Sequence, residues 1–184
     1  SRFEAQADMD LDTRMIVQFG KNGMAVNRTR IRYEDGEQVS ETNEGRQVLL
    51  EPVAQVEGYG TKITVQTMDT PDGTIEYYRA ARFYATSFYP GFNQAPWYGH
   101  VSCGGTWKPT YVAVDRSLIP CGTRMYVPGY GFAVAMDNGN FGGAWIDLGY
   151  PDDAYVIWSQ YVTVYFLTPI PATIPYIIPA GYVY

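Results

Sequence analysis

The sequence contains few of the side chains that proteins use to hold metal ions. Its 184 residues include one histidine, His100, and two cysteines, Cys103 and Cys121. A zinc site built from cysteine and histidine takes about four ligands, and these residues supply three. We therefore expect neither a metal nor a cofactor.

Basic residues and long apolar runs are also scarce. Thirteen Lys and Arg oppose nineteen Asp and Glu, so the formal net charge is −6 at pH 7. An acidic chain is poorly suited to the phosphate backbone of nucleic acids. No apolar run approaches the roughly 20 residues of a membrane-spanning helix. We expect no nucleic-acid partner and no membrane span.

Glycine, proline and tyrosine, in contrast, are abundant. The chain has 19 Gly, 12 Pro and 17 Tyr, and 46% of its residues are hydrophobic. This composition is typical of β-structure with many turns, and only 17% charged residues exclude a disordered chain. The expected fold class is mostly β.

Turn signals divide the chain into two β-rich parts. In residues 11–67 short alternating segments with few large apolar side chains surround an Asp35-Gly36 hairpin signal, which predicts an extended β-ribbon module. Residues 68–82, with the turn sequence TPDGT, are interpreted as a linker. Residues 83–168 contain about six short strands joined by Gly/Pro turns, which predicts a closed six-stranded barrel.

Two segments and the cysteines complete this outline. A short helix is expected over 154–160 with Asp152 as its N-cap, and the proline-rich residues 169–184 are expected to form an extended tail. Cys103 and Cys121 are either two buried thiols or one disulfide formed in an oxidising compartment. A disulfide would tie the aromatic loop 90–109 to the segment after Asp115.

Three aspartates, Asp115, Asp137 and Asp147, each follow an apolar strand of the second part. A carboxyl at the rim of a barrel is partly desolvated, which raises its pKa and allows it to act as an acid near neutral pH. The alternative is that each aspartate accepts backbone N–H bonds in its turn. The spacing alone leaves both interpretations open for Asp137 and Asp147 and favours the turn role for Asp115.

The run AVDRSLIPCGTRMYVPGYGFAVAMDNG at 113–139, followed by WIDL at 145–148 and preceded by Ala85-Thr86, resembles the 3D (three-aspartate) domain over roughly residues 83 to 167. The resemblance implies a double-psi β-barrel that cleaves peptidoglycan glycan strands without water and leaves 1,6-anhydro ends. It implies that Asp147 is the catalytic acid/base and Asp137 its partner. Thr86 would contact substrate, and Asp115 would hold the barrel.

The sequence departs from the family pattern after Asp137. Asn138 begins a stretch about one residue shorter than the family's, and glycine stands where the family has a lysine. Asn138 is a candidate substrate-binding residue, and Lys108 either replaces the lost lysine or is a solvated loop charge. The aromatic residues Trp97, Tyr98 and Trp107 either stack on sugar rings or cap the barrel.

Residues 11–67 resemble the G-five domain of bacterial surface proteins through GKNG at 20–23, RIRYEDG at 30–36 and GYGTK at 58–62. That resemblance implies wall attachment or aminosugar binding, and a rigid spacer is the alternative.

Together these features predict a secreted or cell-surface bacterial lytic transglycosylase, a monomer whose partner is peptidoglycan or a related aminosugar polysaccharide. Two rivals stay open. One is a non-catalytic, expansin-like wall-binding protein. The other is an inverting polysaccharide hydrolase, whose two carboxyl groups would need to lie about 6.5–9.5 Å apart to admit a water.

Overall fold

The computed structural model describes residues 2–92 and 99–178. By its internal contacts the chain divides into two compact units. Unit 1 comprises Ser1–Met9 and Thr13–Gly60, and unit 2 comprises Asp10–Asp12 and Thr61–Tyr184. Strands dominate the described residues, and no α-helix occurs among them. The mostly β fold is therefore confirmed.

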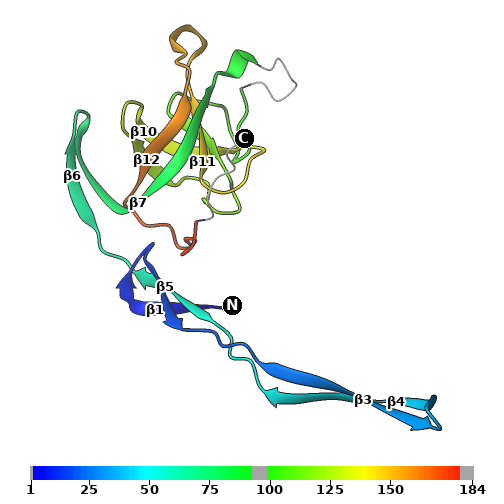
Figure 1. Cartoon of the computed structure of the whole chain (residues 1–184). Coiled ribbons are helices and arrows are strands. Elements are labelled where there is room, and N and C mark those ends of the chain that lie inside the picture. The colour runs from blue at the N-terminus through cyan, green and yellow to red at the C-terminus, as the bar shows by residue number, and fades with distance from the viewer. Residues whose placement is uncertain (1, 93–98, 179–184) are drawn as a thin grey trace. The chain divides into compact units, whose positions relative to one another are not determined.

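Unit 1 contains a three-stranded sheet and a two-stranded ribbon. In the sheet, β5 (Val56–Lys62) lies between β1 (Arg2–Asp10) and β2 (Arg14–Gln18). In the ribbon, β3 (Met24–Glu34) pairs with β4 (Glu37–Leu50), and the predicted two-residue hairpin turn joins them (Figure 1). Strand β1 was not predicted, although apolar residues (Phe3, Ala5, Ala7 and Met9) alternate with polar ones along it, which is a strand pattern.

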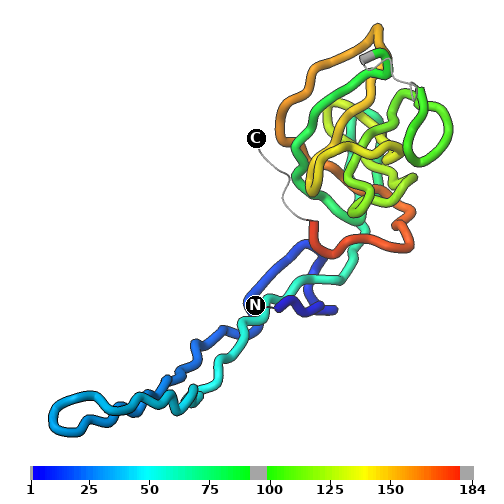
Figure 2. The backbone as a smooth tube through the Cα atoms, turned by 90° about the vertical axis from the view of Figure 1, so that its right-hand side faces the viewer, coloured from blue at the N-terminus to red at the C-terminus, as the bar shows by residue number. Residues whose placement is uncertain are grey.

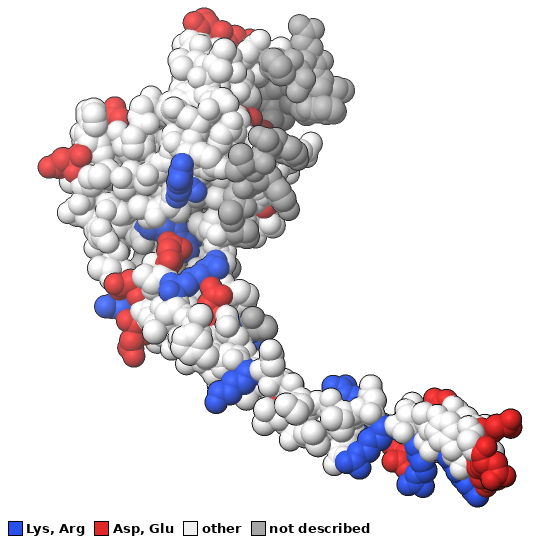
Figure 3. Space-filling view, in the orientation of Figure 1, with Lys and Arg blue, Asp and Glu red and all other residues white. Residues whose placement is uncertain are grey.

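The β3–β4 ribbon has almost no buried side chain. Every residue of β4 and all but one of β3 is exposed. Charges of both signs lie along it (Figure 3), and Arg30 of β3 forms an ion pair with Glu44 of β4 at 2.6 Å. Cross-strand pairs rather than a core hold such a ribbon. This agrees with the prediction of an extended β-ribbon module.

Unit 2 contains a closed six-stranded barrel, as predicted. The strands follow one another around the ring in the order β7, β11, β8, β10, β9, β12 and back to β7, and Figure 2 traces the backbone of this ring. The pairings of β8 with β10 and of β7 with β11 are parallel, and the other four are antiparallel. The ring strands are β7 (Gly73–Phe88), β8 (Tyr111–Val114), β9 (Arg124–Val127), β10 (Gly131–Asn138), β11 (Trp145–Gly149) and β12 (Ser159–Leu167).

Alternation along the strands separates the barrel core from its outer face. Phe83 and Ala85 of β7 and Ile146 and Leu148 of β11 are fully buried in one core cluster. Because successive side chains of a strand point to opposite faces, Tyr84 and Thr86 of β7 and Asp147 of β11 face outward.

Two predicted segments have a different structure. The expected linker 68–82 lies in strands, because β6 (Gln66–Thr70) forms a hairpin with the start of β7 and Thr70 pairs with Gly73 across a two-residue turn. The predicted helix at 154–160 was wrong. Only a 3₁₀ turn, η2 (Asp152–Ala154), occurs there, and Asp152 accepts a hydrogen bond from the backbone N–H of Gly91 at 3.4 Å instead of capping its own segment.

The ends of unit 2 pack onto the barrel. Asp12 accepts two hydrogen bonds of 2.9 Å from the guanidinium of Arg79, whose side chain is 1% exposed. In the proline-rich tail, Ile174 and Ile178 lie against the barrel core. In the described part of the chain no helix is long and apolar enough to span a membrane.

Candidate active site

Four neighbouring strands place one row of residues on the outer face of the barrel. Asp147 of β11 pairs with Thr86 of β7 on one side and with Ala113 of β8 on the other. Ala113 also pairs with Asp137 of β10. Paired residues of adjacent strands point to the same face, so the two carboxylates flank a small side chain. With adjacent strands ~4.8 Å apart, the Cα atoms of the two aspartates are about 10 Å apart.

Asp147 lies in a partly apolar environment with one strong hydrogen bond. The hydroxyl of Thr86 donates to Oδ1 of Asp147 at 2.7 Å, and the indole N–H of Trp145 donates to that hydroxyl oxygen at 3.0 Å. Burial raises the pKa of the Asp147 carboxyl above its usual range. The hydrogen bond from Thr86 lowers this pKa and the negative charge of Asp137 raises it further. The carboxyl therefore keeps its proton to a higher pH than an exposed aspartate.

Asp137 is held by the backbone. Its Oδ1 atom accepts hydrogen bonds from the N–H groups of Ser102 and Asn138, both at 2.9 Å. The adjacent Cys103 N–H donates to the carbonyl of Met136 at 3.0 Å. The loop around Ser102 thus runs along the end of β10 and fixes one carboxylate oxygen of Asp137.

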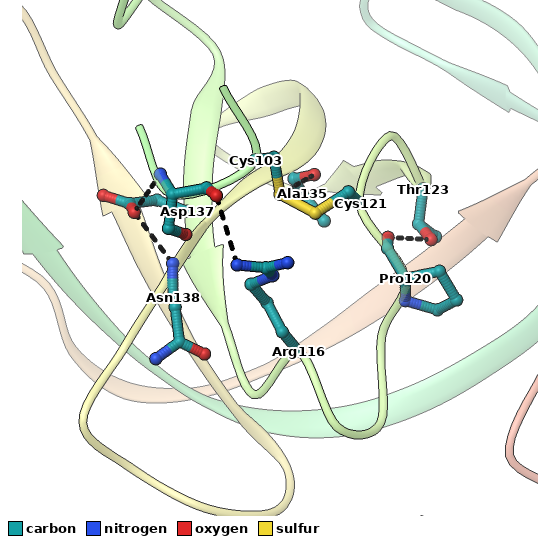
Figure 4. Close-up of a disulfide and its surroundings, with 9 residues drawn as sticks. Cys103, Arg116, Pro120, Cys121, Thr123, Ala135, Asp137 and Asn138 are labelled. Carbon is teal, nitrogen blue, oxygen red and sulfur yellow. Dashed lines mark hydrogen bonds between the residues drawn. A yellow bond between two sulfur atoms is a disulfide. The ribbon is translucent and has the colours of Figure 1, made fainter. Parts of the chain in front are cut away.

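A disulfide anchors that loop (Figure 4). Cys103 and Cys121 are bonded, with their Cα atoms 5.8 Å apart, so the disulfide is confirmed over the alternative of two buried thiols. The guanidinium of Arg116 donates to the carbonyl of Ser102 at 3.2 Å. Two different contacts therefore hold the segment that positions Asp137.

Asp115 has the contacts of a structural carboxylate. Its Oδ1 accepts hydrogen bonds from the N–H and the hydroxyl of Ser117 at 2.9 and 2.5 Å, and its Oδ2 accepts one from the N–H of Gly143 at 3.0 Å. Burial alone would raise the pKa of Asp115, but these hydrogen bonds outweigh it and the pKa is lowered. Asp115 joins the turn after β8 to the segment before β11.

Trp97 and Tyr98, two of the other sequence-predicted site residues, lie outside the described residues. Lys108 and Trp107 belong to the loop before β8 and not to the strands that form the row. Lys108 is exposed, and its carbonyl accepts the N–H of Tyr111 at 3.0 Å. The indole nitrogen of Trp107 is buried, without a hydrogen-bond partner among the described residues. It lies 2.9 Å from where a Cβ at Gly149 would stand.

Asn138 is exposed and follows Asp137 directly on β10. Its backbone N–H donates to Asp137, and in the strand pairing it lies opposite Val114 of β8. Its place at the strand end leaves its side chain in solvent next to the row.

Sequence reasoning missed Trp145, which lies beside the acid. In addition to its hydrogen bond with Thr86, its ring stacks on Phe141 with centroids 5.2 Å apart and an interplanar angle of 14°, and it meets Tyr84 edge-on at 5.1 Å. Its position two residues before Asp147 in the WIDL motif was the available signal, because residues i and i+2 of a strand share a face. An aromatic cluster thus adjoins the row.

No group of three or more His, Cys, Asp or Glu side chains within residues 2–92 and 99–178 is arranged to hold a metal ion. The side chains of the row and of its neighbour Trp145 are carboxyl, hydroxyl, methyl and aromatic groups.

Comparison with known protein families gives two matches in the predicted order. Residues 2–62 match the model of the G5 (G-five) domain, and residues 110–168 match that of the 3D domain. A comparison with curated proteins gave no match. The 3D domain occurs in proteins that act on peptidoglycan, so the function is related to the cell wall. The two domains and the disulfide fit an extracellular or surface protein.

Proposed function

We propose that this protein, in which a G5 domain precedes a 3D domain, cleaves peptidoglycan glycan strands as a secreted lytic transglycosylase. The observation that carries the proposal is the state of Asp147. It is a half-buried carboxyl with a raised pKa, a hydrogen bond from Thr86 and a second carboxylate in the same row. Such a group can be protonated before the reaction and ionised after it.

The proposed reaction uses Asp147 twice. As an acid it gives its proton to the glycosidic oxygen while the C1–O bond breaks and positive charge develops on the sugar. As a carboxylate it then takes the proton from the C6 hydroxyl of the same sugar, whose oxygen forms the new bond to C1. No water is consumed, and Asp147 ends protonated. The attacking hydroxyl is intramolecular, so its effective concentration is high.

The neighbours of Asp147 have distinct roles in this proposal. Thr86 orients the acid, and the Trp145 indole fixes the Thr86 hydroxyl. Asp137 raises the pKa of Asp147 and offers negative charge to the oxocarbenium-like centre. Ala113 lies between the two aspartates, and its methyl side chain is too short to separate them.

The spacing of the row supports a second candidate, an inverting hydrolase. Cα atoms about 10 Å apart on two strands of one face can place their carboxyl groups within the roughly 6.5–9.5 Å of an inverting pair. Asp137 would then activate a water. The two mechanisms differ in their products.

The test is digestion of purified peptidoglycan in ¹⁸O-labelled water, followed by mass spectrometry. The proposal expects unlabelled 1,6-anhydro ends, and the hydrolase expects labelled reducing ends. Asp147→Asn should lower either activity about 10²–10⁴-fold, and the exposed Asp153→Asn serves as the control. Wall binding without either product from the wild-type protein would refute both and leave a non-catalytic wall-binding protein.

A further inference from the structure

A cavity of about 260 Å³ lies on the barrel away from the Asp147 row. It is formed where the start of β7, strand β9, the start of β10 and the end of β12 meet. Its lining includes Glu76, Arg124 and Thr168 as polar residues and Ile75, Phe132 and Leu167 as apolar ones. Nothing in the mechanism above uses this cavity.

Two opposite charges line the cavity without neutralising each other. Glu76 accepts a hydrogen bond from the hydroxyl of Thr168 at 3.4 Å. Within the described part of the chain, the Arg124 guanidinium forms no ion pair and no hydrogen bond, with Glu76 or any other residue. Guanidinium and carboxylate groups make their strongest hydrogen bonds with charged partners. The cavity therefore suits a ligand that carries both a carboxylate and an ammonium group.

The apolar lining adds a further preference. Ile75 and Leu167 are buried at 3% and 4% exposure, and Phe132 is 41% exposed and held edge-on by Tyr126 with centroids 5.5 Å apart. These groups can cover the aliphatic part of an amino acid. Glu76 and Arg124 are both exposed, so a neutral sugar would leave them hydrated and would gain no charge-assisted hydrogen bonds from them. A short peptide with free charged groups fits better than a glycan.

The cavity lies within the reach of a short peptide from the row. Phe132 and Asp137 both belong to β10, and Val134, on the outer face between them, pairs with Arg124. A β-bulge between Ala135 and Asp137 brings Phe132 and Asp137, five positions apart, to the same outer face. With that bulge the two residues are at most about 17 Å apart. An extended peptide of four or five residues spans about 13–18 Å. A peptide attached to a sugar at Asp137 could thus reach Phe132 and Arg124.

We propose that this cavity binds the charged end of the peptide that peptidoglycan carries on its lactyl sugar. Arg124 holds the peptide carboxylate, Glu76 holds its amine, and Phe132 covers its aliphatic atoms. The inference rests on the proposed function, since it names the part of that substrate recognised beyond the glycan. It makes the protein selective for glycan strands that bear peptides.

The test is calorimetric binding of the full chain to a synthetic stem tetrapeptide with a free carboxylate and a free side-chain amine. Two comparison peptides carry a C-terminal amide or an acetylated amine. The wild-type protein should bind the free peptide about tenfold or more tightly than either comparison peptide. Arg124→Gln should abolish the preference over the amide, and Glu76→Gln the preference over the acetylated form.

Arg28→Gln, an exposed arginine of the unit 1 ribbon, is the matched control and should bind like the wild type. Circular dichroism confirms that each variant is folded. Equal affinity of the wild-type protein for all three peptides, or no binding at millimolar peptide, would overturn the inference. Asp147→Asn should bind the tetrapeptide with unchanged affinity, so failure of the cleavage proposal and failure of the peptide site give different results.

Discussion

Asp147, the acid of the proposed reaction, should lower the stability of the fold. Burial raises its pKa, which means that the ionised carboxylate is less favourable in the folded protein than in the unfolded chain. Asp147→Asn keeps the size of the side chain and an oxygen acceptor for Thr86, and removes the charge. We expect the free energy of unfolding at neutral pH to rise by about 1 kcal/mol. The melting temperature should rise by roughly 2–4 °C.

The stability that Asp147→Asn gains over the wild type should change with pH in one direction only. A raised folded-state pKa means that the native protein binds more protons than the unfolded chain. The destabilisation by Asp147 therefore begins as pH rises above the unfolded value of about 3.9 and is complete above the folded-state pKa. Wild type and variant should be equally stable at acid pH and should diverge as pH rises.

Asp115→Asn is the matched control with the opposite sign. Its pKa is lowered, so its stabilisation is present above the unfolded value and is lost as pH falls through the folded-state pKa. The side-chain NH₂ of the new asparagine faces an N–H donor, of Ser117 or of Gly143, where Asp115 has an acceptor oxygen. The lost hydrogen bond should lower the free energy of unfolding by about 1–2 kcal/mol at neutral pH. Urea unfolding followed by tryptophan fluorescence, repeated from acid to neutral pH, measures both variants. A loss of stability in Asp147→Asn at neutral pH would refute the reasoning.

Three further outcomes are expected. Asp137→Asn removes a charge that raises the pKa of Asp147, so the alkaline limb of the pH–rate profile should move to lower pH; an unmoved limb would show that this charge has no effect. Thr86→Val removes a hydrogen bond that lowers the same pKa and should move the limb to higher pH, whereas Thr86→Ser should not. Cys103→Ser removes the disulfide between residues 18 apart and should lower the free energy of unfolding by roughly 3 kcal/mol. Chemical denaturation in the presence and absence of reductant measures this; equal stability of wild type and variant without reductant would contradict it.

The barrel strands could be predicted because their local patterns are strong. The runs at 111–114 and 161–167 combine β-branched and aromatic residues between turn signals, and both are strands in the structure. The helix at 154–160 failed because Asp152 bonds to another segment. The β-branched and aromatic residues after it also disfavour helix. Residues 2–10 alternate apolar and polar side chains, which is a strand pattern that the sequence reasoning passed over. The pairing of β1 with β5 joins distant segments and cannot be read from residues 2–10 alone.

The candidate site was predictable as residue types but not as an arrangement. Asp137 and Asp147 each follow an apolar strand, which places them at strand ends. That both pair with Ala113 depends on the registers of two different strand pairs, one parallel and one antiparallel. Local sequence does not determine such registers. The backbone contact between Ser102 and Asp137 uses an N–H group that every residue except proline carries, so no residue type could have indicated it.

The parallel pairing of β7 with β11 has a consequence for when activity can arise. It joins Thr86 to Asp147 across 61 residues of chain, and pairings between such distant segments are among the slow events of folding. A slip of one residue there would turn Asp147 toward the core and Ile146 toward solvent. The acid and its hydroxyl partner therefore meet only when the ring has closed in its correct register. An unfolded chain carries every side chain of the row, but under the proposed mechanism it could not yet cut a glycan strand.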